Sequence, residues 1–228
     1  MKAMILAAGL GNRMRPLTDH TPKPLLEVAG KPLIVYHIEK LIEAGFSEII
    51  INIAHLGQMI PTALGDGSKW DVKITYSDEQ EEGALESLGD IVKALPLLGN
   101  ETFLVVNGDV WCDYTFDANL SLNNKLAHLV LVDNPDHNLK GDFALEGLSV
   151  KCEGNDKLTF SGIGYYSPTL FKDQPYGSAS LAPLLREVMD LGKVSAEHYK
   201  GVWRDIGTPE RLQEINDNFK QQQKDKKW

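Results

Sequence analysis

The chain has 228 residues, of which 43% are hydrophobic and 24% charged, and its formal net charge at pH 7 is −9. This composition is typical of a globular protein with one large domain or two small ones. No apolar run is long enough to cross a bilayer, so we expect no membrane partner. The acidic balance argues against nucleic acid as a partner.

Cysteine usage and the N-terminus suggest a cellular location. Cys112 and Cys152 are the two cysteines, and they form neither a disulfide framework nor a zinc-binding pattern. The N-terminus lacks the layout of a signal peptide. We therefore expect a cytoplasmic location.

The first predicted element is a buried strand at residues 4–8, which ends in small residues that include Gly9 and Gly11. Arg13 follows, and then Lys23, which stands between two prolines. Small residues let backbone N–H groups approach an anion closely, and arginine can bind phosphate oxygens in a bidentate way. We therefore interpret this stretch as a phosphate-binding loop in preference to an ordinary turn with solvated arginines.

Two better-known phosphate motifs do not fit this stretch. It lacks the Gly-Lys-Ser/Thr ending of a P-loop. Met14 stands where a dinucleotide-binding fingerprint has its third glycine.

The rest of the chain alternates helical and strand patterns. We expect helices from Pro32 to Gly45, at 55–64 with a disturbance at Pro61, at 85–95, at 181–191 and from Thr208 onward. We expect strands at 48–53, 72–76, 102–106, 126–132, 163–166, 194–199 and 202–206.

The order strand, helix, strand argues for parallel crossovers. Short β-like pieces alternate with turns from Gly141 to Phe160, which suggests an antiparallel excursion. We predict a single α/β domain over residues 1–220, with a Rossmann-like, mostly parallel mixed sheet. Residues 221–228 are predicted to form a disordered tail.

Two aspartates follow predicted strands, where ligands of such sheets bind. Asp109 closes Val-Val-Asn-Gly-Asp, and Asp205 lies in Trp-Arg-Asp-Ile-Gly-Thr. An aspartate after a strand is often a turn or cap residue. The Asn-Gly-Asp context favours a ligand role instead.

The opening stretch, Leu6-Ala-Ala-Gly-Leu-Gly-Asn-Arg-Met-Arg-Pro-Leu-Thr with Lys23-Pro-Leu, resembles the signature of sugar-1-phosphate nucleotidylyltransferases. Three later stretches are similar to the N-acetylmuramate 1-phosphate uridylyltransferase branch of bacterial cell-wall recycling: Val132-Asp-Asn-Pro-Asp-His, Phe160-Ser-Gly-Ile and Leu181-Ala-Pro-Leu-Leu-Arg. The resemblance implies the nucleotide-diphospho-sugar transferase fold and transfer of a uridylyl group from UTP to N-acetylmuramate 1-phosphate.

Two alternatives stay open. A mannose-1-phosphate guanylyltransferase shares the opening motif. A non-catalytic sugar-nucleotide sensor would share the fold, but the joint presence of Arg13, Lys23, Asp109 and Asp205 argues against it. A glucose-1-phosphate thymidylyltransferase is disfavoured because the Glu-Lys-Pro element of those relatives is missing.

The resemblance also implies roles for single residues. Asp109 and Asp205 would hold Mg²⁺, Arg13 would stabilise the pyrophosphate, and Lys23 would bridge the triphosphate and the sugar phosphate, with direct in-line attack and no protein nucleophile. The candidate nucleotide-binding residues are Leu6, Ala8, Gly9, Gly11, Asn12, Arg13, Lys23 and Gly83. The candidate sugar-phosphate residues are Asn107, Gly141, Asp142, Ser161 and Asp205.

One segment departs from the pattern of these relatives. They tend to carry Leu-Glu-Thr-Gly-Gly-Gly-Ile, whereas this chain reads Leu85-Glu-Ser-Leu-Gly-Asp-Ile. We interpret Leu88 as a helix core residue and Asp90 as a solvated charge, and the change bears on base preference. His137 and His198 are expected to be exposed loop residues. A monomer is expected because the chain lacks the C-terminal extensions that larger relatives use to form oligomers.

Overall fold

The computed structural model describes residues 1–83 and 85–225 of the chain. Its helices are α1 (Leu33–Glu43), α2 (Met59–Leu64), α3 (Glu86–Leu98), α4 (Leu181–Asp190) and α5 (Pro209–Asp225). Its strands are β1 (Lys2–Leu6), β2 (Glu27–Val28), β3 (Lys31–Pro32), β4 (Glu48–Ile53), β5 (Lys73–Asp78), β6 (Phe103–Asn107), β7 (Val110–Cys112), β8 (Ala127–Val132), β9 (Phe143–Glu146), β10 (Ser149–Lys151), β11 (Lys157–Tyr166), β12 (Val194–Tyr199) and β13 (Trp203–Asp205).

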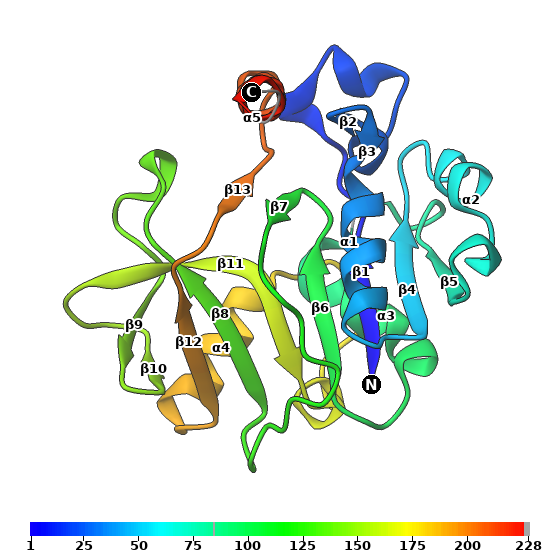
Figure 1. Cartoon of the computed structure of the whole chain (residues 1–228). Helices are drawn as coiled ribbons and strands as arrows, with labels where there is room; N and C mark the ends of the chain where they lie inside the picture. Colours follow the sequence, from blue (N-terminus) through cyan, green and yellow to red (C-terminus); the bar gives the residue numbers. More distant parts are fainter. Residues whose placement is uncertain (84, 226–228) are drawn as a thin grey trace.

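The main sheet orders its strands β5-β4-β1-β6-β11-β8-β12-β10-β9. The first four are parallel to one another, which is the arrangement of half a Rossmann fold. β11 then runs antiparallel to both β6 and β8, while β8 and β12 are parallel. The predicted mixed sheet in a Rossmann-like α/β fold is therefore confirmed (Figure 1).

Helices cover both faces of the sheet, and the strand residues alternate between the two cores. Ala3 and Ile5 of β1 join the core that contains Ile34 and Ile38 of α1. Met4 joins the opposite core with α3 and α4. This period of two places the apolar residues of one strand on both faces, as a sheet buried on both sides requires.

The predicted antiparallel excursion is also present. β9 and β10 form an antiparallel pair, and β9 also pairs with β11. β11 is longer than the predicted strand 163–166, because it begins at Lys157. Its register against β8 shifts between Phe160 and Ile163, which marks a bulge.

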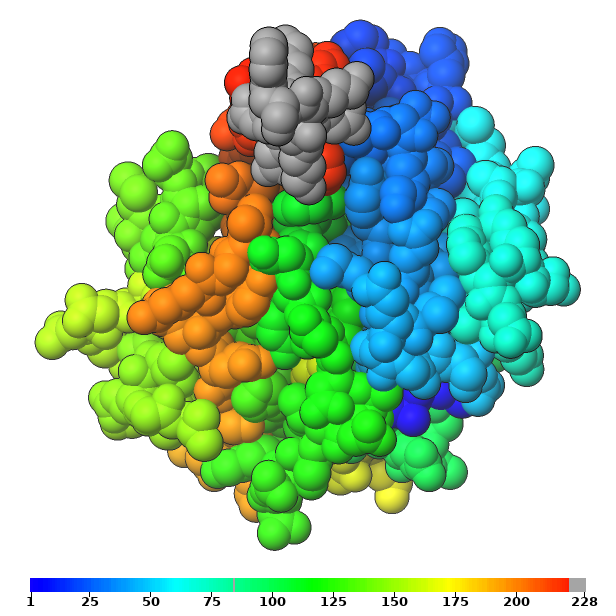
Figure 2. All heavy atoms as spheres, in the orientation of Figure 1, coloured from blue at the N-terminus to red at the C-terminus, as the bar shows by residue number. Residues whose placement is uncertain are grey.

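The last helix packs against the opening loop, although the two lie at opposite ends of the sequence. The side chain of Asn216 in α5 accepts a hydrogen bond from Ala29 N and donates one to Glu27 O. Met14 and Leu33 pack with Ile206 and other apolar residues of this region in a third small core. The space-filling view shows atoms of α5 beside those of the N-terminal segment (Figure 2).

Three boundary predictions need correction. β1 spans Lys2–Leu6, whereas the strand was predicted at residues 4–8. α2 begins at Met59 and not at His55, because proline is tolerated in the first turn of a helix, and Pro61 therefore lies near its start. α5 continues to Asp225, past the predicted boundary at 220, so residues 221–225 belong to a helix and not to a disordered tail. The rest of the predicted tail, 226–228, lies outside the described residues. Within residues 1–83 and 85–225, no helix is long and apolar enough to cross a membrane.

Candidate active site

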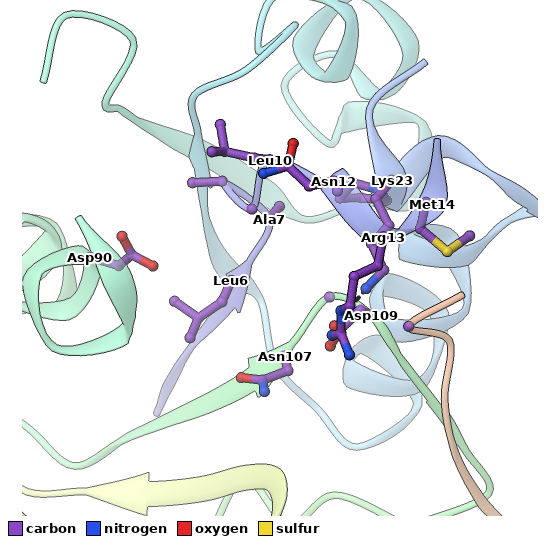
Figure 3. A pocket seen from close by; sticks show the side chains of 16 residues that line it. Leu6, Ala7, Leu10, Asn12, Arg13, Met14, Lys23, Asp90, Asn107 and Asp109 are labelled. Carbon is purple, nitrogen blue, oxygen red and sulfur yellow. Dashed lines mark hydrogen bonds and ion pairs between the residues drawn. The ribbon is translucent and has the colours of Figure 1, made fainter. Parts of the chain in front are cut away.

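A cavity of about 440 Å³ lies at the carboxyl ends of β1 and β6. Nine predicted site residues line it: Leu6, Ala8, Gly9, Gly11, Asn12, Arg13, Lys23, Asn107 and Asp109. Figure 3 shows Arg13, Lys23 and Asp109 at one side and Asp90 at the other, with Leu6 and Ala7 between them. The cavity thus has a charged end with two cations and a second end formed by α3.

Local contacts hold the loop after β1 in shape. Gly11 has a φ of +64°, and a Cβ there would lie 2.8 Å from the Thr18 side chain, so the position requires glycine. Thr18 Oγ1 donates a hydrogen bond to Gly11 O. At the start of the loop, the backbone N–H of Ala7 donates to Asn52 Oδ1 on β4 at 2.7 Å. Thr18 belongs to the opening motif but was given no role of its own, and Asn52 was not predicted to take part.

The charged end brings together residues far apart in the chain. Lys23 Nζ donates to Asp109 Oδ2 at 2.7 Å, and the lysine side chain is only 11% exposed. Arg13 reaches toward the loop after β13, since a Cβ placed on Gly207 would lie 3.3 Å from Arg13 Nη2 and 2.9 Å from Asp205 Oδ1. Two cations and two carboxylates therefore meet at this end.

A short ladder that sequence patterns did not predict as a pair places the two aspartates together. β7 and β13 pair antiparallel, with Asp205 opposite Val110, and Ile206 N donates to Asp109 O at 2.8 Å. β7 begins directly after Asp109, and β13 ends at Asp205. This pairing explains how residues almost a hundred positions apart reach the same edge of the fold.

Further side chains hold Asp205. Arg211 Nη1 donates to its Oδ2 at 2.8 Å, and His137 Nε2 lies 3.2 Å from the same oxygen. These residues line a second cavity of about 360 Å³. His137 is exposed, as predicted, but it lies in a short 3-10 helix and its ring contacts this aspartate. His198, predicted to lie in a loop, instead lies in β12 and contacts Asp133.

The two aspartates form a donor set that could hold a divalent cation. Asp205 Oδ1 is buried, and it has no hydrogen-bond partner within the described ranges 1–83 and 85–225. The same part of the chain contains no cluster of three or more His, Cys, Asp or Glu side chains arranged for a metal. Mg²⁺ commonly takes one or two carboxylates and completes its shell with water and substrate phosphates, so this pair fits it.

A third cavity of about 230 Å³ adjoins the first and shares Leu6 and Asn107 with it. Gly162 is required beside Asn107, because its φ is +78° and a Cβ would lie 2.5 Å from Asn107 Nδ2. Asp142 lines this cavity as well. Its carboxylate accepts hydrogen bonds from Phe160 N and Asn138 Nδ2, which hold it at the cavity wall.

Three predicted residues line none of these cavities, as far as the described residues define them: Gly83, Gly141 and Ser161. The contacts of Ser161 do not support the predicted role of its side chain in sugar binding. Ser161 is 1% exposed, and its Oγ donates to Val130 O and accepts from Ile163 N. Those bonds satisfy the backbone of the bulge in β11. Gly83 and Gly141 both have positive φ and lie in turns.

The segment that departs from the relatives gives one confirmed and one wrong interpretation. Leu88 is 6% exposed and packs in the core around α3, as predicted. Asp90 is not a solvated charge, because it is 8% exposed and lines the main cavity. Behind it lies Glu79, which is fully buried. The helical spacing of apolar residues in α3 could have indicated that Asp90 lies on the buried face of the helix. No sequence pattern linked Asp90 to Glu79.

Comparison with known proteins identifies related chains. The sequence profile described as nucleotidyl transferase matches residues 2–143. An N-acetylmuramate alpha-1-phosphate uridylyltransferase of Neisseria meningitidis is 53% identical over 94% of this chain and 96% of its own length. A mannose-1-phosphate guanylyltransferase catalytic subunit beta of Danio rerio is 29% identical over 92% of this chain and 62% of its own length.

The fold itself recurs in solved structures. A crystal structure described as a glucose-1-phosphate thymidylyltransferase from Bacillus anthracis has a TM-score of 0.84 and 23% sequence identity. The match covers 96% of this chain and 94% of that one. At this level of identity the likeness shows a shared architecture.

Proposed function

The chain belongs to the nucleotidyl transferase family, and we propose that it transfers a uridylyl group from UTP to N-acetylmuramate 1-phosphate. The products are UDP-N-acetylmuramate and pyrophosphate. The observation that carries this proposal is the 53% identity to an N-acetylmuramate alpha-1-phosphate uridylyltransferase over almost all of both chains. The mannose-1-phosphate guanylyltransferase relative is more distant at 29%, so we rank that activity second.

The charged end of the main cavity supports the transfer chemistry. The reaction brings two anions together, so positive charge must offset their repulsion and hold them in line. Arg13 lies where it can bind the leaving pyrophosphate. Lys23, held by Asp109 at 2.7 Å, can contact the triphosphate and the sugar phosphate on either side of the bond that changes. An oxygen of the sugar phosphate then attacks the α-phosphorus directly, and pyrophosphate leaves with the electron pair of the broken bond.

We propose Mg²⁺ as the cofactor, held by Asp109 and Asp205. The buried, unpaired Oδ1 of Asp205 among the described residues and the adjoining carboxylate of Asp109 support this assignment. When bound, the ion would neutralise phosphate charge and orient the phosphate oxygens. Arg211 and His137 keep the Asp205 carboxylate in position.

The third cavity is our proposed site for the sugar. Asn107 lies between this cavity and the main one, so it can bond a hydroxyl of the sugar or of the ribose. Asp142 can accept from a hydroxyl or amide group. We propose that the reaction belongs to peptidoglycan recycling and takes place in the cytoplasm, where UTP is made.

A substrate panel tests the proposal. Pyrophosphate release is measured with Mg²⁺ for UTP, CTP, GTP and dTTP, each combined with N-acetylmuramate 1-phosphate, mannose 1-phosphate and glucose 1-phosphate. We expect the highest kcat/KM for UTP with N-acetylmuramate 1-phosphate. Turnover of GTP with mannose 1-phosphate, and none with the first pair, would refute the proposal in favour of the second activity.

A further inference from the structure

A buried pair of carboxyl groups closes the main cavity at the end away from the phosphate-binding residues. Asp90 on α3 lines the cavity and is 8% exposed, and Glu79 behind it is fully buried. Asp90 Oδ1 and both Glu79 Oε atoms are buried, and so is Nδ2 of the neighbouring Asn52. None of these four atoms has a conventional hydrogen-bond partner in the part of the chain that is described. Buried polar groups without partners are rare in folded proteins and call for an explanation.

The order of groups along the cavity indicates what this end receives. Arg13 and Lys23 at the opposite end suit the phosphates, so the nucleoside extends from there toward α3. Between the ends lie the backbone and side chain of Leu6 and Ala7 (Figure 3). The apolar side chains of Leu6 and Ala7 offer a contact surface for a base. The edge of a base placed against them faces Asp90, whose carboxylate projects toward the same space (Figure 3).

We propose that Asp90 is a specificity-determining residue that accepts the imide N3–H of the uracil base, with Glu79 as the positioning residue behind it. The inference rests on the proposed use of UTP. Uracil carries a hydrogen on N3, whereas N3 of cytosine is an acceptor that a carboxylate repels. A site built around a buried acceptor discriminates strongly against a base that cannot donate to it, because the acceptor is then left unpaired.

The ionisation of the pair agrees with an acceptor at the cavity face. Burial is the main cause that raises the pKa of both carboxyls, and the Asp90 charge raises the pKa of Glu79 further. A hydrogen bond from Glu79 acts the other way on Asp90 and favours its ionised form. These causes favour a neutral Glu79 behind an Asp90 carboxylate that is available to accept a hydrogen bond from the base.

The backbone holds Asp90 firmly in this place. Leu88 N donates to Ala179 O at 2.9 Å, and Ala179 N donates to Leu85 O at 2.9 Å. A Cβ on Gly89 would lie 2.3 Å from Gly177 O, so the first turn of α3 is in close contact with this segment. Such rigidity suits a residue that must discriminate between bases by position.

The first test requires no mutation. Wild-type kcat/KM is measured for UTP and for 3-methyluridine 5′-triphosphate, in which a methyl group replaces the N3 hydrogen. We expect a loss of about 100-fold or more for the methylated nucleotide. Equal use of both nucleotides would overturn the inference while leaving the proposed function intact. If UTP itself were not a substrate, the proposed function would fail, and the inference with it.

The second test compares Asp90→Asn and Asp90→Gly with Glu101→Gln, a control that changes an exposed carboxylate beyond the end of the same helix. We expect Asp90→Asn to lower kcat/KM for UTP by about 10–100-fold and to reduce the preference for UTP over CTP. Asp90→Gly should reduce the penalty of the N3 methyl group. Inhibition by pyrophosphate should be unchanged in all three variants, because pyrophosphate binds at the other end. An unchanged UTP/CTP ratio, or parallel losses for UTP and pyrophosphate, would contradict the inference.

Discussion

The two ends of the main cavity differ in how they treat charge. At the phosphate end, Lys23 and Asp109 form a close ion pair, and Arg13 lies near Asp205. At the α3 end, Glu79 and Asp90 are carboxyl groups buried next to each other, with an amide as neighbour. The first end can exchange its internal ion pair for substrate phosphate and metal. At the second end burial raises the pKa of both carboxyl groups, which favours a bound proton there.

This difference shows that one cavity can reduce the free-energy cost of buried charge in two ways. Opposite charges in contact lower the free-energy cost of burying one another, so both groups remain ionised. Like charges in contact cannot both ionise, so they share a proton and become a hydrogen-bonding unit. The predictions below test each end separately.

The largest effect is expected from Asp109→Asn. The amide keeps the shape of the side chain and removes the negative charge that pairs with Lys23 and would bind Mg²⁺. We expect kcat to fall by about 10³-fold or more, together with a loss of the Mg²⁺ dependence of the remaining activity. Steady-state assays over a Mg²⁺ titration measure both. Asp113→Asn, in the same segment, is the control for nonspecific loss of charge, and an Asp109→Asn variant with the wild-type Mg²⁺ titration would contradict the metal role.

Lys23→Ala should lower kcat by about 10²–10³-fold, because it removes a cation that is expected to act on both phosphates. Arg15→Ala is a matched control from the same loop, since its side chain is 63% exposed and pairs with Asp19. We expect that control to retain near wild-type activity. Circular dichroism and Tm verify that both variants fold. Wild-type turnover in Lys23→Ala would exclude this residue from the mechanism.

The carboxyl pair should produce a pH-dependent change in stability. Folding raises the pKa of Glu79 and Asp90 above the ordinary carboxyl value, so the folded protein binds protons more tightly than the unfolded chain. Their contribution to stability is complete below the ordinary carboxyl pKa and is lost as the pH rises through the raised values.

Calorimetry of wild type and Asp90→Asn over roughly pH 5 to pH 9 measures this effect. As the pH rises over that range, the Tm of the variant should fall by about 2–4 °C less than the Tm of wild type. Lys93 and Glu86, which act on the pair through their charges, are present in both proteins. Parallel Tm curves for the two proteins would show that the pair does not retain a proton in the fold.

The smallest effect is expected from Ser161→Ala. Its hydroxyl bonds backbone groups of the β11 bulge, so its removal should cost about 1 kcal/mol of folding free energy. KM for the sugar phosphate should not change, because the side chain is buried away from the cavities. Urea unfolding and steady-state kinetics test the two statements. A raised KM with unchanged stability would restore Ser161 to the sugar site.

Much of the phosphate end could be predicted from the sequence because its residues are close along the chain. Gly11, Arg13 and Lys23 lie in one loop, and their type and spacing reflect what an anion needs: small backbone groups and nearby cations. Asp109 was recognisable because it directly follows a strongly apolar strand. Asn52 was not, since its contact with the Ala7 backbone depends on the neighbouring position of β1 and β4.

The sequence alone determined the alternation of strands and helices and the chemical character of the opening loop, because hydrophobic periodicity and local residue types are properties of neighbours in the chain. Only the tertiary structure decided which distant groups meet. It brought Asp205 to Asp109 through the β7–β13 ladder. It also directed the Ser161 side chain toward backbone groups at the bulge of β11 and placed Asp90 against Glu79. Such meetings depend on strand order and on which face of an element is buried, and packing of the whole chain sets both.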